Sequence, residues 1–142
     1  MIYLASPYWH PDPAVRQARF HAACRQVAEM LRCGITVFSP VVYFHQLATD
    51  YALPLVETFW RALNRQILTA SDEVWVLKLD GWEKSRGVRA EIKMAEQLGK
   101  PVMLIEPDPH DDQATKTPLV ILGPGGDYVR KYYAEDFKWL SS

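Results

Sequence analysis

The chain has 142 residues, of which 49% are hydrophobic and 23% charged, and its formal net charge is −1. This length and composition predict a single globular domain spanning residues 1–142. The balanced charge, with no segment dominated by lysine or arginine, argues against a nucleic-acid-binding protein and against a membrane-surface protein.

Cysteine and histidine spacing excludes further classes. Cys24 and Cys33 fall on one predicted helix and cannot frame a disulfide scaffold, so we expect a reduced, cytoplasmic compartment. No apolar run approaches the length of a membrane span, and the first residues have the pattern of a strand rather than of a signal peptide. The four histidines have no metal-ligand spacing with the cysteines or with each other, so we expect no metal site.

Apolar periodicity predicts an alternation of strands and helices. The first half begins with a strand at residues 2–6, a helix opened by Asp12 and Pro13 and ended by Gly34, and a strand at 35–38. A short helix followed by a loop within 41–54, a helix at 55–70, a strand at 73–79 and a helix at 86–98 come next. The last part has strands at 102–105 and 119–122, separated by a surface loop, and a terminal helix at 128–140. Asp12 has the chemistry of an N-cap, and Pro13 suits the first helical position.

This alternation predicts an α/β fold with a parallel sheet covered on both faces. With right-handed crossovers, we expect a flavodoxin-like three-layer sandwich with five parallel strands in the order 2-1-3-4-5. The ligand crevice of such a sheet opens between the carboxyl ends of the first and third strands. These ends carry polar and aromatic side chains, namely Ser6, Tyr8 and Trp9 after the first strand and Asp80 and Trp82 after the third.

Glu91 is the leading candidate for a functional residue. The predicted helix at 86–98 has an apolar stripe that includes Val88, Ala95 and Leu98, and Glu91 lies on that stripe about one turn from the helix start. A carboxylate aimed at a core is costly unless it is paired, and such positions are often functional. The alternative is a glutamate at the edge of the stripe that bends towards solvent.

The start of the same helix offers an anion site. Ser85 is placed as an N-cap, and its hydroxyl together with the free amides around Gly87 could also bind an anion. Arg19, near the start of the first helix, is a candidate phosphate ligand, although exposed arginines are usually solvated. No dinucleotide-binding or Walker pattern is present, and no serine-hydrolase elbow is found.

Three segments carry a resemblance to a known family. IYLASPY at residues 2–8, the stretch from Asp72 to SRGVRAE at 85–91, and GKPV at 99–102 resemble the nucleoside 2-deoxyribosyltransferase superfamily. Within it, the chain is most similar to a bacterial branch called domain of unknown function 1937. The resemblance covers most of residues 1–105.

The resemblance implies roles for particular residues. The glutamate matching Glu91 attacks C1′ of the sugar and displaces the base, and the tyrosine matching Tyr3 hydrogen-bonds that glutamate. The position of Ser85 contacts the 5′ side of the sugar, and it is a serine in relatives that hydrolyse 5′-monophosphates. Asn64 stands where the family usually has an aspartate that helps to protonate or orient the base, and an amide cannot act as a general acid.

Together these features predict cleavage of an N-glycosidic bond, by hydrolysis or deoxyribosyl transfer, in a nucleoside 5′-monophosphate or nucleoside, without metal or organic cofactor. Glu91 would be the nucleophile or would stabilise an oxocarbenium-like transition state, and Tyr3 would hold it in place. The phosphate would be bound by Ser85, by the amides near Gly87 and by Ser6 or Arg19, and the base would stack on Tyr8, Trp9 or Trp82. The alternatives are a nucleotide-binding or regulatory module without catalysis, which Asn64 favours, and a purely structural subunit.

The aromatic surface predicts assembly. The helix at 55–70 carries Phe59 and Trp60 on an apolar arc wider than one sheet face needs, and the segment 128–139 adds further tyrosine, phenylalanine and tryptophan residues. The resembled superfamily forms dimers or larger assemblies. We therefore expect a homo-oligomer built on two-fold contacts.

Overall fold

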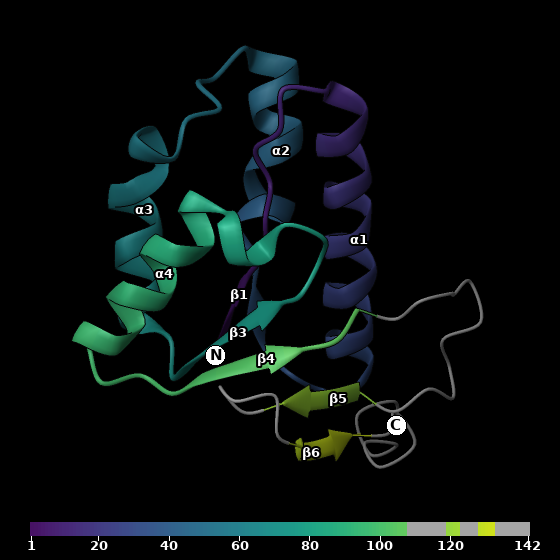
Figure 1. Ribbon diagram of the computed structural model, residues 1–142, viewed down its shortest axis with the longest axis vertical. Helices are drawn as coiled ribbons and strands as arrows, with labels where there is room; N and C mark the ends of the chain where they lie inside the picture. Colours follow the sequence, from purple (N-terminus) through teal and green to yellow (C-terminus); the bar gives the residue numbers. More distant parts are fainter. Residues whose placement is uncertain (108–118, 123–127, 133–142) are drawn as a thin grey trace.

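The computed structural model describes residues 1–107, 119–122 and 128–132. These residues form a six-stranded sheet in the order β2-β1-β3-β4-β5-β6, with helices on both faces (Figure 1). The strands are β1 (Ile2–Ala5), β2 (Val37–Phe38), β3 (Glu73–Leu77), β4 (Val102–Ile105), β5 (Leu119–Leu122) and β6 (Tyr128–Tyr132). The helices are α1 (Pro13–Arg32), α2 (Pro40–Tyr51), α3 (Glu57–Ala70), the short 3₁₀ helix η1 (Trp82–Lys84) and α4 (Arg86–Gln97).

The first four strands confirm the parallel part of the predicted sheet. β1 lies between β2 and β3, and β4 pairs with the far side of β3, all in parallel register. This order places the reversal of the sheet between β1 and β3, so their carboxyl ends face a common crevice. The predicted cap of α1 is also confirmed, because the Asp12 side chain accepts a hydrogen bond from the amide of Ala14.

The prediction of five parallel strands is wrong, because β5 runs antiparallel to β4. A parallel fifth strand would need a crossover connection, usually a helix. The sequence between β4 and β5 lacks the apolar periodicity that predicts such a helix. The fifth strand therefore takes the predicted position in the order but the opposite direction.

The predicted terminal helix at 128–140 is also wrong over its first part. Residues Tyr128–Tyr132 form β6, which pairs antiparallel with β5. Tyrosine and valine in this segment favour a strand, and the open edge of β5 provides a partner for it. The remaining residues of the predicted helix, from 133 onwards, lie outside the described residues.

Alternation along the strands divides the core into two layers. Leu4 and Trp75 pack in a cluster with Met30 of α1 on one face of the sheet. Tyr3 and Val74 belong to the opposite cluster, which includes residues of α3 and α4. Figure 1 shows α1 on one side of the sheet and α3 and α4 on the other. Tyr3 therefore points towards the helix that carries Glu91.

Helix α2 covers the upper end of the molecule next to α1 and is longer than the sequence predicted. Ser39 caps it by accepting a hydrogen bond from the amide of Val42 at 3.2 Å, and Pro40 opens it. α3 begins at Glu57, two residues later than predicted. A third apolar cluster, which includes Tyr8, Phe44 and Trp60, joins α2 and α3 to the loop after β1.

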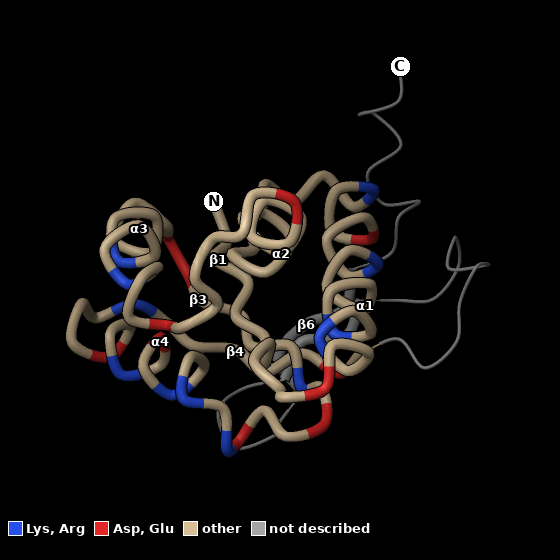
Figure 2. Tube along the Cα trace, turned by 90° about the horizontal axis from the view of Figure 1, so that it is seen from above, with Lys and Arg blue, Asp and Glu red and all other residues tan. Residues whose placement is uncertain are grey.

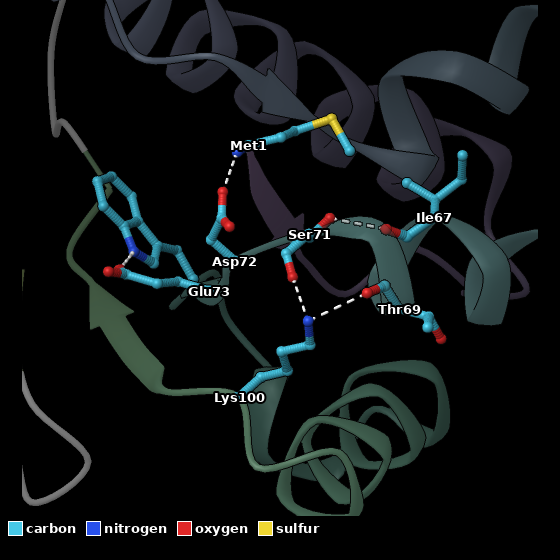
Figure 3. Close-up of polar contacts among 8 residues, drawn as sticks. Met1, Ile67, Thr69, Ser71, Asp72, Glu73 and Lys100 are labelled. Carbon is cyan, nitrogen blue, oxygen red and sulfur yellow. Dashed lines mark hydrogen bonds and ion pairs between the residues drawn. The ribbon is translucent and has the colours of Figure 1, made fainter.

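The other end of α3 is fixed by a lysine (Figure 3). Lys100 Nζ donates to the carbonyl oxygens of Thr69 at 3.0 Å and Ser71 at 2.6 Å, and so satisfies acceptors at the helix end. Beside it, the ammonium group of Met1 forms an ion pair with Asp72. These contacts tie the end of α3 to the starts of β1, β3 and β4.

Candidate functional site

A cavity of about 580 Å³ opens beyond the carboxyl end of β1. Its walls come from the loop after β1, from α2 and α3, and from the segment joining η1 to α4. The lining residues are Ser6, Tyr8, Trp9, Pro40, Val41, Phe44, Leu55, Val56, Glu57, Thr58, Trp60, Asn64, Lys84, Ser85, Arg86, Gly87 and Glu91. This volume is in the ordinary range for small-molecule sites.

Seven of the eleven predicted site residues line this cavity, namely Ser6, Tyr8, Trp9, Asn64, Ser85, Gly87 and Glu91. An eighth, Tyr3, lies behind the wall and reaches the cavity through Glu91. Arg19, Asp80 and Trp82 are not among the lining residues.

Glu91 is directed inward. Its relative exposure is 9%, and its Oε1 accepts a hydrogen bond from the Tyr3 hydroxyl at 2.8 Å. The alternative of a side chain bent towards solvent is therefore excluded. Tyr3 comes from β1 and Glu91 from the second turn of α4, and the contact forms because both face the layer between the sheet and α4.

The burial of this pair changes its acidity. Desolvation raises the pKa of Glu91 to about 8, the hydrogen bond from Tyr3 lowers it in part, and the negative charge of Glu57 raises it. The pKa of Tyr3 is raised well above its usual value, first by burial and then by the charges of Glu91 and Glu57. Tyr3 therefore stays a neutral hydrogen-bond donor, and Glu91 takes up a proton near neutral pH.

The start of α4 forms a cationic side of the cavity. Ser85 caps the helix as predicted, because its Oγ accepts a hydrogen bond from the amide of Val88 at 3.3 Å. Lys84 and Arg86 flank it, and neither side chain makes a hydrogen bond or ion pair within the described part of the chain. Figure 2 shows lysines and arginines gathered along α4, on the side of the molecule that α3 and α4 occupy. Helix N-termini with such cations favour anions.

Gly87 lies on the first turn of α4 and faces the cavity. Its backbone is not left-handed, and an added Cβ would meet only Ser85 Oγ, at 3.9 Å. Packing within the protein therefore does not require a glycine here, although glycine weakens a helix by about 1 kcal/mol relative to alanine. Gly87 instead leaves this part of the cavity wall without a side chain.

Tyr8 is buried, and its hydroxyl is committed to a histidine. The hydroxyl oxygen lies 2.6 Å from His45 Nδ1, and His45 Nε2 lies 2.8 Å from Gln17 Oε1. Because an amide oxygen only accepts, His45 donates from Nε2, and its Nδ1 accepts from Tyr8. Burial, followed by electrostatic interaction with His21 and Arg16, lowers the pKa of His45, so the imidazole is neutral. No local pattern indicates that His45 and Tyr8 meet, since they are separated by 37 positions.

Arg19 holds loops together instead of lining the cavity. Its guanidinium donates to the carbonyl oxygens of Trp9 at 2.7 Å and Asp80 at 3.2 Å, so it joins the loop after β1 to the loop after β3. Gly81 has φ of +85°, and an added Cβ there would lie 3.2 Å from Arg19 Nη2. A glycine is therefore needed at this turn, and Arg19 is engaged with backbone oxygens.

The two predicted stacking tryptophans differ in position. Trp9 lines the cavity with 60% of its surface exposed, and the guanidinium of Arg16 lies 5.2 Å from the centre of its ring. Trp82 is half-buried and packs against the apolar cluster below α4. Trp9 is thus available at the cavity mouth, and Trp82 serves the core.

Helix α3 contributes polar side chains to the cavity, among them Asn64 and Glu57. Asn64 is buried, and its Oδ1 has no hydrogen-bond partner among the described residues; the same holds for Ser6 Oγ. Glu57, which the sequence analysis did not select, also lines the cavity and is paired with Arg61. The signal for Glu57 was its seven-residue spacing from Asn64, which places both on one side of a helix.

The described residues do not bring three or more histidine, cysteine, aspartate or glutamate side chains into a group that would hold a metal ion. No helix in the described part of the chain has both the length and the apolar character needed to cross a membrane.

Comparisons with known proteins identify a family and a similar solved structure. The family model described as domain of unknown function (DUF1937) matches residues 1–107. Among solved structures, a 2-deoxyribosyltransferase from the psychrotolerant bacterium Bacillus psychrosaccharolyticus is similar, with 26% sequence identity and a TM-score of 0.51. The similarity covers 78% of this chain and 74% of that chain. A comparison with curated proteins gave no significant match.

Proposed function

The chain belongs to the DUF1937 family, and from this membership and the geometry of the Glu91 cavity we propose that it cleaves the N-glycosidic bond of a nucleoside 5′-monophosphate or nucleoside. The observation that carries the proposal is the buried carboxyl of Glu91, which accepts a hydrogen bond from the Tyr3 hydroxyl at 2.8 Å. This carboxyl lines a cavity large enough for a nucleotide. The similarity to a 2-deoxyribosyltransferase supports the same class of substrate.

In the proposed reaction Glu91 attacks C1′ and the base leaves with the electron pair of the C1′–N bond. Tyr3 orients the carboxylate throughout. Because the attacking form of Glu91 is ionised and its pKa is about 8, base release should increase as the pH rises towards 8. The product of the first step is a glycosyl ester of Glu91, which water or an acceptor base then resolves.

The cationic side of the cavity supports a phosphorylated substrate. Lys84, Arg86, the Ser85 hydroxyl and the first amides of α4 together would bind a 5′-phosphate, which is a dianion near neutral pH. Other walls of the cavity are apolar and suit the base. They include Phe44 and Trp60, whose rings stack with their centroids 4.6 Å apart.

A panel of ribo- and deoxyribonucleosides and their 5′-monophosphates tests the proposal, with free base followed by chromatography. We expect release from at least one monophosphate, faster than from the matching nucleoside, and no release by the Glu91→Gln variant. Lys84→Gln combined with Arg86→Gln should raise KM for the monophosphate only. If high concentrations of enzyme release no base from any member of the panel, the protein is not a nucleotide N-glycosidase.

The second candidate function is a nucleotide-binding module without catalysis, and Asn64 favours it. An amide at this position cannot protonate a leaving base, and such help is typically worth about 10²- to 10⁴-fold in rate. Scanning fluorimetry separates the two functions. A nucleotide that raises the melting temperature and is recovered intact supports the binding module, whereas a nucleotide that is cleaved supports the enzyme.

The homo-oligomer remains a prediction, and exposed apolar residues support it. Trp60 is buried by its own chain, but Val56 and Phe59 stay exposed. Helix α2 adds Tyr43 and Tyr51, which lie on one exposed side two turns apart. Light scattering after gel filtration tests the prediction, and a mass of 16.3 kDa at micromolar concentration would exclude it.

A further inference from the structure

The cavity contains a second carboxylate besides Glu91. Glu57 is the first residue of α3, and Asn64 follows it by seven residues, which is about two helical turns. Trp60 lies between them on the same side of the helix, and all three residues line the cavity. α3 therefore presents a carboxylate to the cavity about two turns before the amide of Asn64.

Arg61 fixes the orientation of this carboxylate. Its Nε donates to Glu57 Oε1 at 3.0 Å and its Nη2 donates to Oε2 at 2.8 Å, in a two-point ion pair. A carboxylate has about four acceptor sites, so an ion pair of this kind leaves each oxygen free to accept one more hydrogen bond. Glu57 can thus hold a water molecule on its cavity side while Arg61 keeps the group in place.

Glu57 is also electrostatically close to the Tyr3–Glu91 pair. Its negative charge contributes to the raised pKa of Glu91 and to that of Tyr3. Two carboxylates that flank a sugar are the usual arrangement for glycosidic-bond cleavage through a covalent intermediate.

We propose that Glu57 is the general base of the second step, in which water resolves the glycosyl ester formed on Glu91. This inference rests on the proposed function. In the first step the base departs with the bonding electron pair and takes a proton from solvent. In the second step the water oxygen attacks C1′, its proton moves to the Glu57 carboxylate, and the C1′–O bond to Glu91 breaks with its electron pair returning to Glu91. Glu57 then releases the proton to solvent, so both carboxylates are regenerated.

The other polar groups of the cavity are less suited to this step. The amide of Asn64 does not accept a proton, and the ammonium of Lys84 and the guanidinium of Arg86 have no basic lone pair. His45 lies behind Tyr8, and both of its ring nitrogens are engaged. Among the described residues that line the cavity, Glu57 is the one carboxylate besides the nucleophile Glu91.

The test is the Glu57→Gln variant, with the 5′-monophosphate that the wild type cleaves as the probe. Loss of a general base should slow steady-state release by about 10²- to 10⁴-fold. The first step should persist, because removal of the Glu57 charge favours ionisation of Glu91. We therefore expect a burst of one equivalent of base per site, and a mass increase of one sugar phosphate on the quenched protein.

Sodium azide provides a decisive addition, since this nucleophile needs no general base. Azide should restore turnover of Glu57→Gln and form the 1-azido sugar phosphate, with little effect on the wild type. Glu83→Gln is the matched control, because Glu83 is an exposed glutamate on η1 that does not line the cavity. Its burst and steady-state rates should match those of the wild type, and thermal melting confirms that both variants are folded.

The outcomes separate the two proposals. A wild type that releases base, together with a Glu57→Gln variant that shows no burst, no adduct and no azide rescue, overturns the role of Glu57 and leaves the proposed function intact. Steady-state release at the wild-type rate by Glu57→Gln also overturns it. A wild type that cleaves no nucleotide overturns the proposed function and this inference with it.

Discussion

The Glu91→Gln substitution should stabilise the protein, by an amount that depends on pH. Glutamine is nearly isosteric with glutamate, and its Oε1 can still accept the 2.8 Å hydrogen bond from Tyr3. The substitution removes an ionisable group from a buried position. The unfolded chain solvates the carboxylate well and the folded protein does not, so the wild type is penalised whenever the carboxylate would be ionised in the unfolded state.

The magnitude follows from the pKa of Glu91, which rises from 4.5 to about 8 on folding. Below pH 4.5 the group is neutral in both states and the penalty is absent. Between pH 4.5 and 8 the unfolded state ionises while the folded state does not, so the wild type loses about 1.4 kcal/mol of stability per pH unit. At pH 7 the accumulated loss is roughly 3 kcal/mol, and above pH 8 it no longer grows.

Urea unfolding of both proteins at a series of pH values between 4.5 and 9 measures this effect. The difference in free energy of unfolding between Glu91→Gln and the wild type cancels the contribution of groups that the two proteins share. It should increase in favour of the variant up to about pH 8 and then level off. Glu96→Gln, which changes an exposed glutamate of the same helix, is the matched control and should not reproduce the rise seen with Glu91→Gln. A constant difference for Glu91→Gln as well would show that Glu91 is not desolvated in the folded protein.

Three further predictions concern the same region and its support. Tyr3→Phe removes the hydrogen bond that lowers the pKa of Glu91, so the pH profile of base release should shift to higher pH; an unchanged profile would show that Tyr3 does not act on Glu91. Ser85→Asp keeps an N-cap for the amide of Val88, so the free energy of unfolding should change by less than about 1 kcal/mol. Repulsion between the aspartate and a phosphate should raise KM for 5′-monophosphates and leave KM for nucleosides unchanged. Equal effects on both ligands would remove the phosphate assignment. Lys100→Met removes the donor to two carbonyl oxygens at the end of α3. Urea unfolding should show a free energy of unfolding lower by about 1–3 kcal/mol, and steady-state kinetics should show an unchanged KM. A large rise in KM would instead place Lys100 in the substrate site.

The sequence alone was sufficient where short-range patterns decide the structure. The apolar stripe of α4 placed Glu91 on the side of the helix that faces the core, with a side chain bent towards solvent as the alternative, and its 9% exposure decides for the inward direction. Ser85 was identified as an N-cap from its place before the helix. The order of the four parallel strands followed from the alternation of strands and helices, because right-handed crossovers leave few arrangements. In each case neighbours within a few residues, or a general rule of chain connection, carry the information.

Contacts between distant segments were decided only by the tertiary structure. The direction of β5 depends on how the chain returns to the edge of β4, and a four-residue apolar run can pair with that edge in either direction. Arg19 had the sequence context of a phosphate ligand, but backbone oxygens of two loops engage it, one of them 61 positions away. Glu57 enters the cavity because α3 packs beside α4, and neither its neighbours nor its own helix pattern specify that packing. Local periodicity determines which way a side chain points, whereas packing of elements far apart in the chain determines what it meets there.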